Sequence, residues 1–186
     1  APAAEVNWSM LARHNAENAL PASLAARAAG VPIETSVAAL KEFQGVRRRM
    51  EVRGVVNGIT VYDDYAHHPT AVATTIDGLR RKIGSARLIA VLEPRSNTMK
   101  LGTHSAALAG ALSQADHVWM YQGPNVTWDV AGSVATLGKR AETVRDLDQL
   151  ITQLDASLVS GDHVLIMSNG GFGGIHGKLL DRLRKR

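Results

Sequence analysis

The sequence predicts an α/β protein built on a three-layer, Rossmann-like sheet that is mostly parallel. Short apolar runs recur along the chain, and amphipathic segments with helical spacing separate them. Such runs are typical of parallel strands that are buried on both faces. Asn57-Gly58 separates two strand-like segments and predicts a two-residue turn, so one edge of the sheet should be an antiparallel hairpin.

The chain begins with segments that predict helices only. An alanine-rich helix is expected over residues 9–29, with Ser9 as its N-cap and Gly30 just beyond its end. Pro32 prevents this helix from continuing. A second, shorter helix is expected over residues 36–43.

At Gln44-Gly45 the sequence changes from alanine-rich helix to alternating β-type sequence. We therefore predict a domain boundary at this point. Residues 1–45 would be the terminal helices of a preceding domain, and residues 46–186 would be the α/β domain.

The α/β part alternates strands with helices. Strands are expected over residues 50–56, 59–62, 88–92, 117–121 and 163–167. Helices are expected over residues 70–81, 105–113, 143–154 and 175–183. This order favours a mostly parallel sheet with helices on both faces.

The composition is that of a globular protein without a membrane span. Of the 186 residues, 45% are hydrophobic and 20% are charged. No apolar run approaches the roughly 18 residues that a span needs. The absence of cysteine excludes disulfides and thiolate metal sites and fits a reducing compartment. We therefore expect a cytoplasmic protein with no membrane partner.

The net charge of +4 and the pI of about 9.7 raise the question of nucleic-acid binding. Basic clusters lie at residues 47–49, 80–82 and 182–186. Aromatic residues make up only 4% of the chain, and no nucleic-acid module signature accompanies the clusters. Solvated helix ends and groups that bind a small phosphorylated ligand also explain the charge, so we expect no nucleic-acid partner.

The most informative segment spans residues 62–70, where a strand gives way to acidic, aromatic and imidazole side chains before a helix begins. It contains Asp64, Tyr65 and His67, and Pro69 restricts the preceding residue to an extended conformation. Ligands of open α/β sheets bind at such strand ends, near the free N–H groups of a following helix. Because no further His, Asp or Glu recurs at ligand spacing, we predict no metal site.

Two other segments carry polar groups just after a predicted strand. Arg95 and Asn97 suit a carboxylate and an amide, and the alternative is a capped turn at Asn97. The last segment, residues 168–174, reads Ser-Asn-Gly-Gly-Phe-Gly-Gly. It lacks the Gly-Lys-Ser/Thr ending of a P-loop, and its glycines allow the close approach of a ligand without specifying which one.

Polar groups elsewhere are less specific. His14, Asn15 and Asn18 lie close together on the first predicted helix. They could bind a nitrogen heterocycle through hydrogen bonds or be ordinary surface groups. The arginines at 47–49 could reach a phosphate or carboxylate, or form a plain solvated cluster. The residues alone leave both alternatives open.

Together these motifs resemble the Mur ligases, which use ATP to join amino acids or peptides to UDP-N-acetylmuramic acid. The resemblance rests on residues 14–19 (HNAENA), 43–51 (FQGVRRRME) and 64–69 (DYAHHP). Residues 92–100 (LEPRSNTMK) and 167–176 (MSNGGFGGIH) are similar to the family member that adds an intact tripeptide. The resemblance covers essentially the whole chain.

The resemblance implies a bacterial, cytoplasmic ligase that recycles cell-wall peptides. It would join L-alanyl-γ-D-glutamyl-meso-diaminopimelate to UDP-N-acetylmuramate through an acyl phosphate, with ATP and magnesium. The magnesium ligands are expected mainly outside this chain, because the family's P-loop and UDP-sugar-binding domain are not recognised in it. The chain is therefore expected to be a C-terminal fragment that is inactive without the N-terminal and central domains of its polypeptide.

The resemblance also implies roles for individual residues. Binding of ATP is implied for His14, Asn15, Asn18, Arg48, Arg49 and Asp64. Binding of the acceptor peptide is implied for Tyr65, His67, Arg95, Asn97, Ser168, Asn169 and Gly170. His67 is also the candidate catalytic residue, and no residue is assigned to a metal.

Two alternatives remain open. The family member that adds L-alanine carries Pro-His-Arg and a second arginine three residues later. Here Pro94 adjoins Arg95 directly, and Thr98 takes the place of the second arginine, which argues against free L-alanine. The other alternative is an α/β module that binds a nucleotide or a peptide without catalysis.

Overall fold

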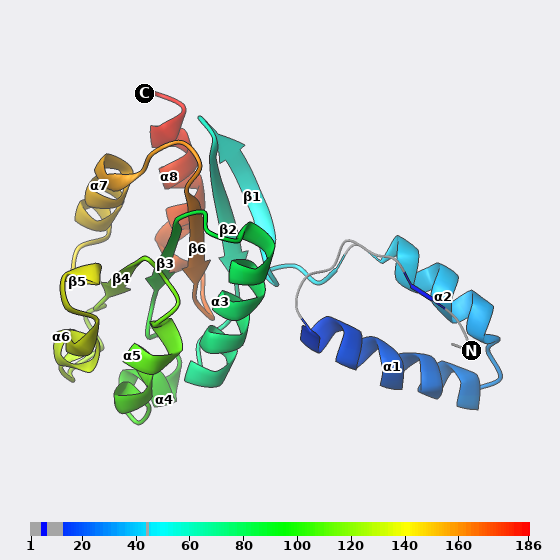
Figure 1. Ribbon diagram of the computed structural model, residues 1–186. Helices are drawn as coiled ribbons and strands as arrows, with labels where there is room; N and C mark the ends of the chain where they lie inside the picture. Colours follow the sequence, from blue (N-terminus) through cyan, green and yellow to red (C-terminus); the bar gives the residue numbers. More distant parts are fainter. Residues whose placement is uncertain (1–4, 7–12, 44) are drawn as a thin grey trace. The chain divides into compact units, whose positions relative to one another are not determined.

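The computed structural model describes residues 5–6, 13–43 and 45–186 (Figure 1). The chain divides into two compact units, residues 1–47 and 48–186. Each unit is described by itself.

The first unit contains two helices, α1 (Arg13–Ala28) and α2 (Ile33–Glu42). α1 ends before Gly30, whose φ of 90° is left-handed, as the sequence predicted. α2 begins three residues before the predicted start because Pro32 occupies its N-cap, and the φ of −59° at this proline suits the first turn of a helix.

Two parts of the sequence-based prediction fall outside the described residues. These are Ser9, the expected N-cap of the first helix, and Gln44 at the expected domain boundary. The boundary predicted after residue 45 lies close to the division between the two units. That residues 1–45 belong to a preceding domain stays a prediction.

The second unit contains a six-stranded sheet in the order β1-β2-β6-β3-β4-β5. Its strands are β1 (Glu51–Val56), β2 (Ile59–Asp64), β3 (Leu88–Leu92), β4 (His117–Tyr121), β5 (Ala141–Val144) and β6 (His163–Met167). Strands β1 and β2 are antiparallel, and every other neighbouring pair is parallel. The predicted fold class is therefore confirmed.

The antiparallel hairpin forms as the turn motif predicted. Asn57 and Gly58 have φ values of 52° and 77°, which are those of a turn whose twist matches a β-hairpin. The pairing of β1 with β2 is irregular between Val52 and Gly54, so β1 carries a bulge.

Helices cover both faces of the sheet (Figure 1). They are α3 (Pro69–Ile83), α4 (Asn97–Lys100), α5 (Ser105–Leu112), α6 (Val130–Ser133), α7 (Leu147–Ser157) and α8 (Ile175–Leu183), with 3-10 turns over Ala135–Arg140 and Phe172–Gly174. One apolar core joins α3 and α5 to the sheet, and a second joins α7 and α8 to the opposite face. Among the described residues, no helix is long and apolar enough to cross a membrane.

The helix predicted over residues 143–154 is wrong at its beginning. Thr143 and Val144 belong to β5, where their β-branched side chains suit a strand that pairs with β4. The helix α7 begins at Leu147, because the side chain of Asp146 accepts a hydrogen bond from the N–H of Gln149 and caps it.

We predict that Gly58→Ala destabilises the protein by about 1–2 kcal/mol. Gly58 has a positive φ, and a Cβ atom there would collide with the hydroxyl of Ser160. Gly177→Ala is a matched control, because Gly177 is exposed in α8 with open space around it. This variant should be more stable than the wild type by up to about 1 kcal/mol. Urea unfolding measures both free energies. Equal effects of the two substitutions would contradict the prediction.

Candidate functional site

The position of β6 between β2 and β3 brings three loops to one edge of the sheet. The ladder continues one residue beyond the strands, since the N–H of Ser168 donates to the carbonyl of Asp64 at 3.1 Å. On the other side of β6, the N–H of Glu93 donates to the carbonyl of Met167 at 3.0 Å. The loops after β2, β6 and β3 therefore lie side by side, at a point where helices leave toward opposite faces and where ligands of such sheets bind.

Arg48 joins the loop before β1 to the end of β2 and the loop after β6. Its Nε donates to the two carboxylate oxygens of Asp63 at 3.2 and 3.3 Å. Its Nη2 donates to the carbonyl oxygens of Ser168 at 2.6 Å and Gly170 at 2.8 Å. These bonds occupy the Nε and Nη2 donors of the guanidinium and hold the loops together. The predicted contact with an ATP phosphate or ribose would require some of them to be replaced.

Asp63 is a buried charge with basic neighbours. Its side chain is 5% exposed, and His176 Nε2 lies 3.4 Å from its Oδ1. Burial by itself would raise the pKa of Asp63, but its interactions with His176 and Arg48 hold the pKa below its usual value. Asp63 is therefore held in its ionised form beneath the Arg48 guanidinium.

Asp64, the next residue, points to the opposite face of the strand and is also buried. Its carboxylate accepts hydrogen bonds from the N–H groups of Met50 and Ala66, each at 2.8 Å, and from the hydroxyl of Thr75 at 3.3 Å. Burial raises the pKa of Asp64, although these N–H groups oppose the shift. The carboxylate thus fixes the loop from inside, and the predicted nucleotide contact would have to displace these internal bonds.

Tyr65 and His67 form the accessible part of the loop after β2, and Arg49 of the segment before β1 lies over the Tyr65 ring. The Arg49 guanidinium lies 5.6 Å from the centre of the Tyr65 ring, and Arg48 lies 5.3 Å from it. His67 Nδ1 is 2.9 Å from the carbonyl oxygen of Tyr65. This contact orients the imidazole and leaves its Nε2 without a hydrogen-bond partner in the described part of the chain.

Ser168 and Glu93 connect the loops after β6 and β3. The Ser168 hydroxyl donates to a Glu93 carboxylate oxygen at 2.5 Å and accepts from the N–H of Gly170 at 3.0 Å. Ser168 is itself buried. The structure therefore gives Ser168, predicted to bind the acceptor, a role in holding the start of the glycine-rich loop.

Arg95 lies against Gly170. A Cβ atom on Gly170 would overlap the Arg95 guanidinium and its Cδ, so only glycine leaves room for the side chain in this position. Arg95 is exposed and has no hydrogen-bond or ion-pair partner among the described residues. Asn169 Oδ1, on the same loop, is buried without a partner in that part of the chain. Arg95 and Asn169 are thus groups that a ligand could satisfy.

The remaining predicted site residues lie in helices. Asn97 is the exposed first residue of α4, which Ser96 caps by accepting from the N–H of Met99 at 3.4 Å. His14, Asn15 and Asn18 all lie in α1, in the first unit. The side chain of His14 is outside the described part of the structure.

The sequence reasoning assigned no role to Asp63, Glu93 and His176, which hold the site together. The positions of Asp63 and Glu93 could have indicated a role in the site, because each lies at or just after the end of a strand beside a predicted ligand residue. His176 gave no local signal, since it meets Asp63 only through the packing of α8. No group of three His, Cys, Asp or Glu side chains able to hold a metal occurs among the described residues.

Comparison with known proteins identifies the class to which this fold and site belong. The family profile "Mur ligase, glutamate ligase domain" matches residues 48–170, about two thirds of the chain. The chain belongs to the Mur ligase family. The match covers the three loops of the candidate site almost completely, up to Gly170.

Particular relatives add detail to this class. The chain is 49% identical to the UDP-N-acetylmuramate–L-alanyl-γ-D-glutamyl-meso-2,6-diaminoheptandioate ligase of Escherichia coli, over 98% of this chain and 40% of that protein. It is 36% identical to a UDP-N-acetylmuramate–L-alanine ligase of Mycolicibacterium vanbaalenii, over 87% of this chain and 36% of that protein. A murein peptide ligase of Psychrobacter arcticus matches in structure with a TM-score of 0.78 and 44% identity, over 97% of this chain and 39% of that one. The chain thus spans about 40% of the length of these relatives.

We predict that Asp63→Asn destabilises the protein by about 1–3 kcal/mol at neutral pH, because it removes the charge that Arg48 and His176 face. The folded-state pKa of Asp63 is lowered. Its stabilisation is therefore present above the unfolded-state pKa of about 3.9 and is lost as the pH falls through the folded-state value. The difference from the wild type should narrow below about pH 4.

Urea unfolding between about pH 7 and pH 3 measures this difference. Asp181→Asn serves as the control, because Asp181 is 66% exposed in a surface pair with Arg184 and should change stability by less than about 0.5 kcal/mol. If the free energies of unfolding of Asp63→Asn and the wild type differ by the same amount down to pH 3, the charge of Asp63 does not stabilise the protein.

Proposed function

We propose that the chain is the C-terminal part of an ATP-dependent ligase that joins L-alanyl-γ-D-glutamyl-meso-2,6-diaminoheptanedioate to UDP-N-acetylmuramate. Residues 1–45 would be the last helices of the central ATP-binding domain, and residues 46–186 the C-terminal domain. The relative of 49% identity carries this activity in its name, which supports the proposal. The UDP-sugar site and most of the ATP site would lie in the additional length of the whole protein.

The observation that carries the proposal is the Arg95 guanidinium in the loop after β3, which has no partner among the described residues. It lies against Gly170, and the preceding residue, Asn169, has a buried Oδ1 that also lacks a partner in the described part of the chain. A carboxylate of an incoming peptide would pair with the guanidinium, and a peptide N–H would satisfy the amide oxygen. Both groups stand at the sheet edge where His67 also lies.

In the proposed reaction, the muramate carboxylate attacks the γ-phosphorus of ATP and releases ADP, which leaves an acyl phosphate. The amine of the peptide then attacks the acyl carbon, and phosphate departs with the bonding electrons. The residues of this chain would act by positioning. His67 Nε2 would accept the amine proton, and Arg49 would face the ATP phosphates.

The nucleotide contacts of the first unit belong to the same proposal. His14, Asn15 and Asn18 of α1 would bind the adenine ring. Magnesium would accompany ATP, and its ligands would come from the additional chain of the whole protein, since the described residues gather no three-ligand group.

An enzyme assay tests the proposal directly. The full-length protein should ligate the tripeptide to UDP-N-acetylmuramate with a kcat/KM at least tenfold above that for free L-alanine, as detected by ADP release and by mass spectrometry of the product. A preference for L-alanine would favour the second candidate, the L-alanine ligase, to which the 36% identical relative belongs. No ligation of either acceptor would favour a binding module.

We predict that Arg95→Ala in the full-length enzyme raises the KM for the tripeptide by about tenfold to hundredfold, through loss of a charge-assisted contact. The KM for ATP should change less than about threefold. Gly170→Ala should mimic this effect, because the new Cβ atom would displace the Arg95 guanidinium.

Gly171→Ala is the matched control for Gly170→Ala, since a Cβ atom at Gly171 meets nothing within 4 Å. Steady-state kinetics with each substrate varied in turn separates the effects. Equal rises in the KM for ATP and for the tripeptide would disprove an acceptor role for Arg95.

A further inference from the structure

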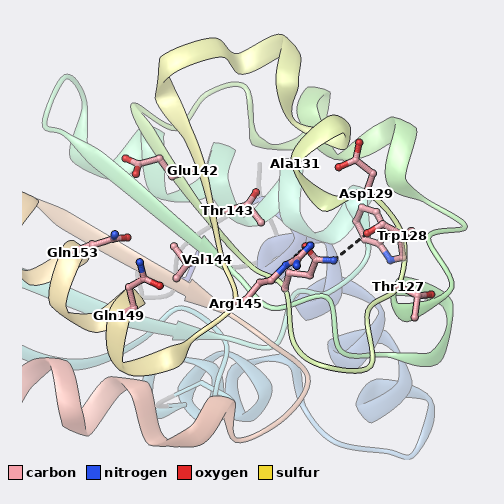
Figure 2. A pocket seen from close by; sticks show the side chains of 11 residues that line it. Thr127, Trp128, Asp129, Ala131, Glu142, Thr143, Val144, Arg145, Gln149 and Gln153 are labelled. Carbon is pink, nitrogen blue, oxygen red and sulfur yellow. Dashed lines mark hydrogen bonds between the residues drawn. The ribbon is translucent and has the colours of Figure 1, made fainter.

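A polar pocket lies farther along the same sheet edge, outside the three loops described above. Its volume is about 640 Å³, and its lining comes from the end of β4, the free edge strand β5, the loop before α6, and α7. Figure 2 shows Arg145 in the middle of this lining, with Trp128 and Asp129 on one side and Gln149 and Gln153 on the other.

Arg145 is held in place by its neighbour across the strand ends. Its Nε donates to Gln122 Oε1 at 3.3 Å. The Gln122 amide is fixed in turn, because its Nε2 donates to the carbonyl oxygens of Val126 at 3.0 Å and Trp128 at 3.3 Å. The two Nη groups of Arg145 have no partner among the described residues, so the guanidinium presents a free pair of donors.

The pocket also offers acceptors for a positive group. The carboxylates of Asp129 and Glu142 lie in its lining. Asp129 Oδ1 accepts from the N–H of Gly132 at 2.9 Å, and Glu142 Oε1 lies 3.1 Å from His117 Nε2, so the second oxygen of each carboxylate faces no partner among the described residues. Gln153 Oε1 is buried and has no hydrogen-bond partner in the described part of the chain. A cation with free donors beside carboxylates and an unsatisfied amide oxygen is complementary to an amino acid that carries both an ammonium group and a carboxylate.

The strand register aligns Arg145 of this pocket with Pro94, the residue before Arg95. Leu92, Met120 and Thr143 are neighbours across β3, β4 and β5. Pro94, Gln122 and Arg145 follow two residues later, just beyond the ends of these strands. Two strand spacings separate β3 from β5, which is about 10 Å. Three extended residues span about 10 Å, so a tripeptide that starts near Arg95 can reach Arg145.

Tyr121 lies between the two positions. Its ring centre is 5.4 Å from that of Phe172, which fixes it beside the loop after β6. Burial, together with the charges of Glu93 and Asp146, raises the pKa of Tyr121. Its hydroxyl therefore stays protonated at neutral pH.

We propose that this pocket binds the distal amino acid of the acceptor peptide, with its carboxylate on Arg145 and its ammonium group on one of the two lining carboxylates, Asp129 or Glu142. The proposal rests on the proposed function. The distal residue named for the relative, a 2,6-diaminoheptanedioate, retains a free amino group and free carboxylates after its first amino group is acylated. Arg145 thereby becomes the residue that distinguishes this peptide from shorter or less charged acceptors.

The experiment compares three acceptors with the full-length enzyme: the tripeptide, the same peptide with L-lysine as third residue, and the dipeptide L-alanyl-γ-D-glutamate. Lysine keeps the distal ammonium group but lacks the distal carboxylate. For the wild type, kcat/KM should fall by about tenfold to hundredfold from the first acceptor to the second. In Arg145→Gln this preference should vanish, while kcat/KM for the dipeptide and the KM for ATP stay unchanged.

Arg184→Gln is the matched control, because Arg184 is an exposed arginine in a surface pair with Asp181 and should keep the preference. If Arg145→Gln retains the preference, or lowers all three kcat/KM values equally, the pocket proposal is overturned and the proposed function stands. A wild type that uses the two tripeptides equally also overturns the pocket proposal alone. A wild type that ligates none of the acceptors overturns both.

Discussion

The insertion of β6 between β2 and β3 is the constraint on which the candidate site depends. β6 is the last strand in the sequence, yet it pairs on both sides near the middle of the sheet. Both cross-loop contacts need this order, since Arg48 reaches from Asp63 to the loop after β6, and Arg95 reaches to Gly170 of the same loop. A sheet with its strands in sequence order would separate these partners.

The two acidic residues at the end of β2 show how one strand serves both faces of the sheet. Asp63 meets His176 of α8 on one face, and Asp64 meets Thr75 of α3 on the other. The basic partners of Asp63 keep it ionised. At Asp64 burial dominates and raises the pKa. Each carboxylate anchors the helix on its own side, and the accessible side chains stand on this rigid base.

The sequence predicted the fold because local signals agreed with the tertiary structure. Asn57-Gly58 formed the expected turn, and His68 has the extended backbone expected before Pro69. β5 was missed because four residues carry too little periodicity, and its strand character comes from pairing with β4. The three site loops were predicted because each follows a strand. The buried roles of Arg48 and Asp64 depend on groups distant in sequence, which no local pattern encodes.

The two edge strands carry features that oppose pairing with another chain. An exposed strand edge can pair with another copy of the chain and start aggregation. β1 opposes this because its bulge between Val52 and Gly54 breaks the regular row of donors, and Arg53 adds a charge there. β5 is only four residues long and borders a polar pocket. A peptide lying in that pocket would also shield the β5 edge. Binding of the peptide would then reduce aggregation through this strand.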